Sequence, residues 1–275
     1  MGEQEVPSKD YGSMNSPIRW AGSKRRLLPI IVNIAPKQYS RYIEPFCGSL
    51  CLYFRLPKIP AVVSDINPEL MHFYRMVRWR PRVVARHLHS WDVAEKTYYK
   101  VRALAPDKLE PELRAARFLY LNRLCFNGVY RTNLRGEFNV PRGNRVPAIP
   151  QEPEILCLAE RLRGTKLLNA DFSEPLSMAG QGDFVYLDPP YAGRDVRNRG
   201  EYGPGSFSMG DIDRLYHSVD SASRRGAKIL ISYADISQIR SAFAGWKVDE
   251  LDVPRNVSGF TRGRGVASEV FLRNY

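Results

Sequence analysis

Short runs of apolar residues recur towards both ends of the chain, and several of them end in a carboxylate. These runs predict strands at residues 41–46, 61–65, 166–171, 183–188, 227–233, 247–253 and 268–273. Continuous apolar runs are typical of strands that are buried on both faces, as in a parallel sheet. Residues 211–225 predict a helix that ends at Gly226. The alternation of strands and helices indicates an α/β fold with a largely parallel sheet.

The middle of the chain has a different pattern. Residues 71–123 are rich in Arg and Tyr at helical spacing, and residues 127–143 contain three glycines that predict a hairpin or ribbon. We therefore predict three parts. Residues 1–16 form a flexible tail, residues 17–70 and 165–275 form the sheet domain, and residues 71–164 form an inserted, mainly helical subdomain.

Composition excludes several classes of protein. The chain has 275 residues, of which 44% are hydrophobic and 25% are charged, as is usual for a globular protein. No apolar run approaches the roughly 20 residues that cross a bilayer, and no signal peptide opens the chain. We therefore expect a cytoplasmic protein without a membrane partner. The four cysteines and four histidines lack the spacing of a disulfide framework or a metal site, so no metal is expected.

The net charge of +12 is concentrated in the middle of the chain. Residues 71–145 contain 16 Lys or Arg against 6 Asp or Glu, a local net charge of +10. A basic block of this size indicates a polyanionic partner, and nucleic acid is the expected one. A basic face that only contacts solvent would give the same count, so charge by itself leaves both interpretations open.

Polar or turn residues lie at the ends of four predicted strands. These residues are Phe46, Asp65, Asp171 and Asp188. In open parallel sheets, ligands bind beyond the carboxyl ends of the strands. A single aspartate at a strand end is usually a helix cap or a turn residue, but four such positions on one rim predict a binding site.

The sharpest motif is Asp188-Pro189-Pro190-Tyr191. Two consecutive prolines lack N–H donors and keep the backbone extended. A carboxylate followed by a rigid carbonyl offers two acceptors, which suits an amine with two N–H donors. Tyr191 adds an aromatic face that can stack on a planar heterocycle. The structural alternative is a proline-rich loop that is capped by an aspartate.

Several motifs in a fixed order make the chain similar to a known family. They are Pro17–Lys24, Glu44–Gly48, Asp65–Asn67, Phe118–Arg123, Asn127–Pro141 and Asp188–Tyr191. Together they resemble the Dam-like family of DNA adenine methyltransferases, from Pro17 to the C-terminus. The resemblance implies a Rossmann-like class I methyltransferase sheet. It also implies S-adenosylmethionine as methyl donor, S-adenosylhomocysteine as product, and methylation of the exocyclic N6 amine of adenine in double-stranded DNA.

The resemblance implies roles for individual residues at the donor site. The implied cofactor-binding residues are Trp20, Lys24, Phe46, Gly48, Asp65, Asp171, Phe172 and Asp188. Among them, Lys24 is expected to meet the donor's carboxylate and Asp65 the ribose hydroxyls. Asp171 and Phe172 are expected to hold the donor's adenine. The family often has a second glycine where this chain has Leu50, which leaves the path of that loop open.

The resemblance also implies catalytic and DNA-binding residues. Asp188, Pro189, Pro190 and Tyr191 would act on an adenine flipped out of the duplex, and residues 71–164 would be the target-recognition insertion. The implied DNA-binding residues are Arg123, Asn127, Val129, Arg131, Asn133, Arg135 and Pro141. By this resemblance Arg131 is the candidate for reading guanine. Among neighbouring residues, Phe126 could fill the space of the flipped base. Arg255, Arg262 and Arg264 form a second positive cluster, which we interpret as a backbone contact or a mobile lid, and a solvated loop is the alternative.

Alternatives from other classes remain at this point. One is methylation of the cytosine amine or of an RNA adenine, although aspartate at the first position of the tetrad favours adenine. Another is a catalytically inactive DNA-binding relative. GATC is the expected target, and a cognate restriction endonuclease is a possible partner of a chain that we expect to be monomeric.

Overall fold

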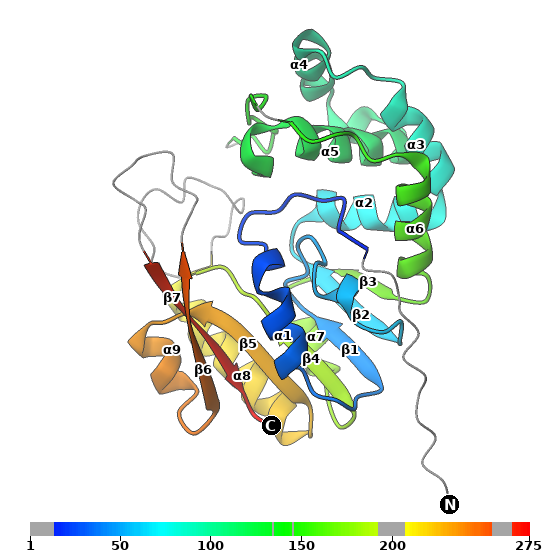
Figure 1. The fold of residues 1–275 in the computed structure, drawn as a ribbon. Helices are drawn as coiled ribbons and strands as arrows, with labels where there is room; N and C mark the ends of the chain where they lie inside the picture. The colour runs from blue at the N-terminus through cyan, green and yellow to red at the C-terminus, as the bar shows by residue number, and fades with distance from the viewer. Residues whose placement is uncertain (1–13, 134, 145, 192–206, 255–265) are drawn as a thin grey trace, which may run out of the picture.

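The computed structural model describes residues 14–133, 135–144, 146–191, 207–254 and 266–275. Within these residues, seven strands form one sheet in the order β3-β2-β1-β4-β5-β7-β6 (Figure 1). The strands are β1 (Arg41–Glu44), β2 (Ala61–Asp65), β3 (Lys166–Asn169), β4 (Asp183–Leu187), β5 (Lys228–Ala234), β6 (Lys247–Pro254) and β7 (Val266–Arg273). The first five are parallel to one another, and β7 is antiparallel to β5 and β6. The predicted α/β fold class is confirmed.

The helices fall into two groups. Those packed beside the sheet are α1 (Leu28–Ile34), α7 (Ser173–Ser177), α8 (Met209–Arg224) and α9 (Ser237–Ala242). Those between β2 and β3 in the chain are α2 (Pro68–Trp79), α3 (Pro81–His89), α4 (Glu95–Ala103), α5 (Pro111–Leu124) and α6 (Glu152–Leu162). Short 3-10 helices are η1 (Arg25–Leu27), η2 (Tyr53–Arg55), η3 (Pro106–Lys108) and η4 (Phe126–Gly128). In Figure 1, α2 and α6 lie nearest the sheet, and α3, α4 and α5 lie farther from it.

Three strands are shorter than the apolar runs that predict them. β1 ends at Glu44, because Pro45 has no N–H to donate to a neighbouring strand. β3 and β4 end before the aspartates that close their runs. Asp171 and Asp188 therefore lie in the loops beyond the sheet, where their side chains are available for other contacts.

Successive strand residues face two separate hydrophobic cores. Tyr42 and Phe184, which are paired in register, belong to the core that includes α1 and the helices between β2 and β3. Ile43 and Val185, the next pair, belong to the core beneath α7 and α8. Since side chains alternate between the faces of a strand, the sheet is buried on both sides, as the continuous apolar runs predict.

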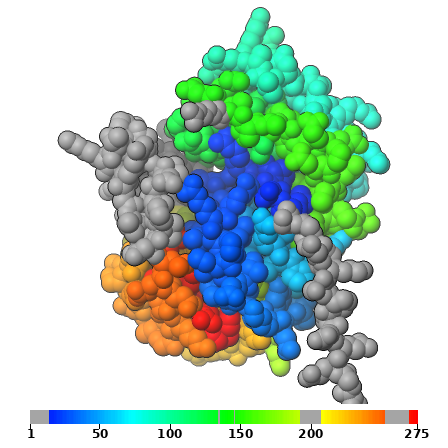
Figure 2. Space-filling view, viewed as in Figure 1, coloured from blue at the N-terminus to red at the C-terminus, as the bar shows by residue number. Residues whose placement is uncertain are grey.

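The N-terminal segment lies against the end of α5. The backbone N–H of Arg19 donates to Asn122 Oδ1 (2.8 Å), and Asn122 Nδ2 donates back to the Arg19 carbonyl (2.6 Å). The Arg19 guanidinium donates to the carbonyls of Arg123 and Cys125, at 3.1 Å each. Figure 2 shows this blue segment directly beneath the green surface of the helical region. At its start, Ser16 is buried.

The segment after α5 is an irregular ribbon. Two isolated β-bridges, Cys125 to Arg142 and Thr132 to Phe138, replace the continuous ladder of a regular hairpin. The predicted hairpin or ribbon is thus present in its looser form. The ring of Tyr130 stacks on Trp20, with 6.2 Å between ring centroids, which ties the ribbon to the N-terminal segment.

Candidate active site

A cavity of about 390 Å³ opens beyond the carboxyl ends of the parallel strands. All of the residues predicted to bind the cofactor or to catalyse line it: Trp20, Lys24, Phe46, Gly48, Asp65, Asp171, Phe172, Asp188, Pro189, Pro190 and Tyr191. They come from the N-terminal segment and from the loops after β1, β2, β3 and β4. The cavity therefore has the location that open parallel sheets give to their ligand sites.

The loop after β1 forms one wall of the cavity. Gly48 has a φ of +41°, and a Cβ added there would lie 2.7 Å from Trp20 Cδ1, so only glycine fits. Leu50 also has a positive φ, 56°, although it is a bulky residue whose side chain is fully buried. The loop thus follows a left-handed path at the position where the family often has a second glycine.

Asp65 ties the first two loops together. Its Oδ2 accepts from the backbone N–H of Gly48 (3.0 Å) and its Oδ1 from that of Asn67 (2.9 Å). Burial raises the pKa of Asp65 to about 6, and the two backbone donors limit the rise. Asn67 in turn caps α2 by accepting from the backbone N–H of Glu69 (3.0 Å). A carboxylate is therefore fixed at the edge of the cavity.

Aromatic rings close the end of the cavity near β3. Phe46 and Phe172 stack at 5.4 Å between centroids, and Phe207 lies 6.1 Å from each of them. The guanidinium of Arg214 lies 4.9 Å from the centroid of the Phe172 ring. This end of the cavity offers flat apolar surfaces of the kind that pack on a heterocyclic base.

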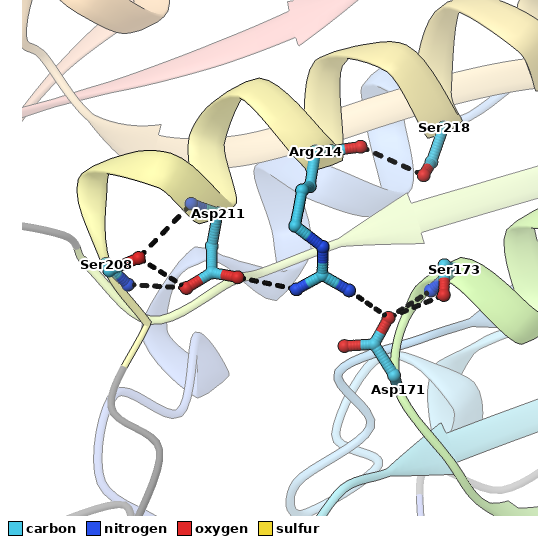
Figure 3. A network of polar contacts seen from close by, with 6 residues as sticks. All are labelled: Asp171, Ser173, Ser208, Asp211, Arg214 and Ser218. Atoms are coloured by element: carbon cyan, nitrogen blue, oxygen red, sulfur yellow. Dashed lines mark hydrogen bonds and ion pairs between the residues drawn. The ribbon is translucent and has the colours of Figure 1, made fainter.

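Arg214 links two carboxylates across this end (Figure 3). Its Nη1 donates to Asp211 Oδ1 (2.6 Å) and its Nη2 to Asp171 Oδ1 (2.9 Å). The same Asp171 oxygen accepts from the backbone N–H (3.0 Å) and the hydroxyl (2.6 Å) of Ser173. Burial raises the pKa of Asp171, but the donors of Ser173 and Arg214 outweigh it and lower the pKa overall. In Figure 3 the other carboxylate oxygen of Asp171 points away from this network.

The tetrad lines the same cavity from the loop after β4, a strand that lies three positions from β3 in the sheet. Asp188 Oδ1 lies 2.9 Å from Lys24 Nζ. The carbonyl of Pro190 accepts from the Tyr233 hydroxyl (3.3 Å). Within the described residues, no hydrogen bond is made to the carbonyl of Pro189, so it remains available as an acceptor.

The positive charge of Lys24 only partly offsets the effect of burial on Asp188. Burial raises the pKa of Asp188, and the Lys24 ammonium opposes the rise. Burial alone would lower the pKa of Lys24, but Asp188, Tyr191 and Glu269 raise it above its ordinary value. The pair therefore consists of the Lys24 ammonium and the Asp188 carboxylate, and this carboxylate is protonated more readily than that of an exposed aspartate.

Sequence reasoning missed four residues of the site. Glu44 lines the cavity at the end of β1, and burial raises its pKa well above the ordinary value. Its position at the end of an apolar run was a usable signal. Arg214 lines the cavity from the first turns of α8, and Phe207 lines it from the position before Ser208, the N-cap of that helix. Glu269 contacts Tyr191 from β7. No motif marks these last three residues.

Several predicted DNA-binding residues make contacts within the protein. Arg123 Nη2 donates to the Ala148 carbonyl (2.6 Å), and its Nη1 donates to the Pro17 carbonyl (3.1 Å). Asn133 Oδ1 accepts from the backbone N–H of Glu137 (3.0 Å) and forms the turn at the tip of the ribbon. Both side chains hold the ribbon and its surroundings in shape.

The remaining candidates lie along the ribbon, outside the cavity. Arg131 is half-buried, and its Nε donates to Asn139 Oδ1 (2.8 Å). Val129 is also half-buried, whereas Asn127, Arg135 and Pro141 are exposed. Arg255, Arg262 and Arg264 lie outside the described residues. Phe126 is 49% exposed beside the turn where Asn127 has a φ of 53°.

The described part of the chain contains no group of three or more His, Cys, Asp or Glu side chains placed to hold a metal ion. It also contains no helix that is long and apolar enough to cross a membrane.

Comparisons with known proteins agree with the motifs. A family model for D12 class N6 adenine-specific DNA methyltransferases matches residues 20–257. The type II methyltransferase M1.LlaDCHI of Lactococcus lactis subsp. cremoris is 30% identical over 267 residues, which cover 94% of each chain. The DNA adenine methylases of Vibrio cholerae (28% over 260 residues, 92% and 93% coverage) and Escherichia coli (31% over 247 residues, 88% of each chain) are also similar.

Among solved structures, the precorrin 8W decarboxylase of Methanobacterium thermoautotrophicum is 13% identical over 98% of each chain, with a TM-score of 0.39. A similarity of this size carries no argument about function. The family model, in contrast, spans most of the chain and both ends of the cavity, which confirms the resemblance that the motifs indicate. The chain belongs to the D12 class N6 adenine-specific DNA methyltransferase family, which is a family of enzymes.

Proposed function

We propose that this protein transfers the methyl group of S-adenosylmethionine to the exocyclic N6 amine of an adenine flipped out of duplex DNA. The arrangement of Asp188 and Pro189 supports this most directly. Both lie on the wall of the cavity that Phe46 and Phe172 also line. The two groups offer rigid acceptors for the two N–H donors of one amine.

The cavity fits the donor in size and in chemistry. A volume of about 390 Å³ lies in the range of small-molecule sites. The remaining lone pairs of the Asp65 carboxylate suit ribose hydroxyls, and the outward oxygen of Asp171 suits the amine of the donor's adenine. Phe46 and Phe172 offer the flat surface on which that adenine packs. S-adenosylmethionine supplies a methyl group on a positively charged sulfur, which is a good leaving group.

Catalysis in this proposal is mainly positioning and electrostatics. The lone pair of the adenine amine is delocalised into the ring, so the amine is a poor nucleophile. Hydrogen bonds to Asp188 and to the Pro189 carbonyl favour a tetrahedral nitrogen whose lone pair faces the methyl group. Asp188 accepts a proton as positive charge develops on that nitrogen, and its raised pKa suits this task. Tyr191 stacks on the flipped base.

Residues 71–164 are proposed as the target-recognition insertion. The net charge of +10 over residues 71–145 suits phosphate contacts. The exposed side chains of Asn127 and Arg135 and the half-buried Arg131 lie on one ribbon next to Trp20, which lines the donor cavity. We propose that Arg131 reads a guanine within GATC.

The proposal is tested by transfer of labelled methyl from S-adenosylmethionine to duplex oligonucleotides with and without GATC. We expect N6-methyladenine after digestion of the product, with GATC duplexes preferred. Asp188→Ala abolishes transfer while duplex DNA is still bound, and Asp213→Ala, at an exposed position of α8, keeps full activity. Folded wild-type protein that binds the donor but methylates no adenine contradicts the proposal.

A second experiment tests the reading of guanine. Arg131→Gln should lower the preference for the duplex with guanine at one position over its substituted forms by about tenfold. Arg142→Gln, on the far strand of the ribbon, should leave the preference unchanged. An unaltered preference in the Arg131 variant contradicts the assignment of this residue.

A further inference from the structure

Glu269 reaches the tetrad from the antiparallel part of the sheet. It lies on β7 and pairs in register with Ala234 of β5. Its Oε1 accepts from the Tyr191 hydroxyl (2.9 Å) and lies 3.7 Å from Lys24 Nζ. The side chain is 14% exposed, and its Oε2 is buried without a hydrogen-bond partner in the described part of the chain. Glu269 is therefore a buried carboxylate that lies next to both Lys24 and Tyr191.

Lys24 contacts two carboxylates at once. Asp188 lies at 2.9 Å and Glu269 at 3.7 Å from the same ammonium, which is 7% exposed. In the proposed reaction, Asp188 accepts hydrogen bonds from the target amine and no longer serves Lys24 alone. Weakening a partner of a buried ammonium is costly, and Glu269 is the second carboxylate of the protein that lies beside it.

Tyr191 is held by the same carboxylate. Its hydroxyl is bound to Glu269 and accepts from Lys24 Nζ (3.2 Å), and its ring meets Tyr233 edge to face at 5.1 Å. These contacts fix both the reach of the side chain and the plane of its ring. A fixed plane favours stacking on the flipped base, because less freedom is lost on binding.

We propose that Glu269 is a positioning residue that holds the Lys24 ammonium and the Tyr191 hydroxyl while Asp188 exchanges Lys24 for the target amine. The inference rests on the proposed function and extends it to a residue outside the tetrad. Glu269 touches neither donor nor base and acts through Lys24 and Tyr191.

The acid limb of the kcat profile separates this role from a merely structural one. Asp188 is surrounded by Lys24, Glu269, Tyr191, Glu44 of β1, Tyr186 of β4 and Cys51. Burial is the main cause of its raised pKa, and the negative charge of Glu269 raises it further. Glu269→Gln removes that charge and leaves the other groups in place. The pKa of Asp188 should fall, and the acid limb of kcat should move to lower pH.

The first experiment measures kcat, KM for DNA and the pH profile of Glu269→Gln. We expect kcat to fall about tenfold, the acid limb to move to lower pH, and the affinity for S-adenosylhomocysteine to stay within about twofold. Glu250→Gln, a 65% exposed carboxylate of β6, is the control and should change none of these. A wild-type kcat, or a reduced kcat with an unmoved acid limb, overturns the inference. If the variant fails to fold, Glu269→Asp should lower kcat with the limb in place.

The second experiment needs no activity. Urea midpoints are compared for wild type, Lys24→Met, Glu269→Gln and the double variant. In Lys24→Met, Glu269 is a buried charge that has lost its cation. We therefore expect Glu269→Gln to lower the urea midpoint less in the Lys24→Met protein than in the wild-type protein. Equal shifts in both backgrounds overturn the inference. If the wild-type protein methylates no DNA, the proposed function is overturned. The urea midpoints would still decide whether Glu269 holds Lys24, because they do not depend on activity.

Discussion

Lys24 Nζ lies 2.9 Å from Asp188 Oδ1, and the two residues are 164 positions apart in the chain, so the N-terminal segment supplies the counter-ion of the tetrad. The resemblance to the family implied a different partner for Lys24, the donor's carboxylate. Both contacts are compatible, because an ammonium has three donors. The short contact makes the stability of the fold depend on this pair.

Lys24→Met should destabilise the protein in a manner that depends on pH. Without the cation, the pKa of Asp188 in the folded state rises further above its unfolded value. Stability is then retained at low pH and lost as pH rises through the folded pKa. We expect a loss of about 3 kcal/mol at pH 8 and a smaller loss at pH 5, measured by urea unfolding. The double variant Lys24→Met with Asp188→Asn should recover stability at pH 8, and a loss that is equal at both pH values contradicts the argument.

Donor binding should weaken below the pKa of Asp65. Burial raises that pKa to about 6, so about one tenth of the carboxylate is ionised at pH 5. Because the proposed ribose contact uses the ionised form, the affinity for S-adenosylhomocysteine should fall by up to about tenfold between pH 7 and pH 5 in calorimetry. Asp65→Asn should bind weakly at both pH values. A wild-type affinity that does not change over this range contradicts the assignment of Asp65.

Arg214 should affect how the donor's base is selected. It holds one oxygen of Asp171, and the other oxygen points away from this network (Figure 3). Since Arg214 is 53% exposed, its ion pair is weak, and Arg214→Gln should lower the affinity for S-adenosylhomocysteine by about threefold. For an analogue of S-adenosylhomocysteine with a keto oxygen in place of the adenine amine, the same substitution should lower the affinity by a smaller factor. Arg224→Gln, an exposed position of the same helix, is the control, and equal losses for both ligands contradict this role.

Replacement by glycine should destabilise the protein less at Leu50 than at Leu52. Leu50 and Leu52 are both fully buried, but Leu50 has a φ of 56° and Leu52 a φ of −74°. Both Leu→Gly variants lose the same buried side chain. Glycine relieves backbone strain at Leu50 and adds flexibility at Leu52. The free energy of unfolding should therefore fall by about 2 kcal/mol less in Leu50→Gly than in Leu52→Gly, and an equal or larger loss at Leu50 would show that this backbone is unstrained.

The parts of the site that follow apolar runs were predictable from the sequence. A strand that is buried on both faces leaves a run that can be recognised, and the residue after it lies on the rim of the sheet. Asp65, Asp171 and Asp188 are found in this way. The order of the strands and the antiparallel pairing of β7 leave no such signal, because they depend on contacts between distant segments.

Glu269 and Arg214 show why the rest was not predictable. Glu269 is the one acidic residue of β7 and belongs to no motif, and only the register of β7 against β5 brings it to Tyr191. Arg214 is one of many arginines, and only the placement of α8 brings it to Asp171. The looser ribbon has a local cause, since the Asn133 side chain accepts backbone N–H groups that a regular hairpin would use.

The segment that carries Arg19 and Trp20 limits how specificity can be re-engineered. Arg19 binds the carbonyls at the end of α5, while Trp20 packs on Gly48 in the donor loop and stacks on Tyr130 in the ribbon. The ribbon is consequently not an interchangeable cassette. In a chimera that grafts residues 125–143 from a relative, we therefore expect that the matching partners at positions 19 and 20 have to be imported as well, because the same segment contacts both the ribbon and the cavity wall.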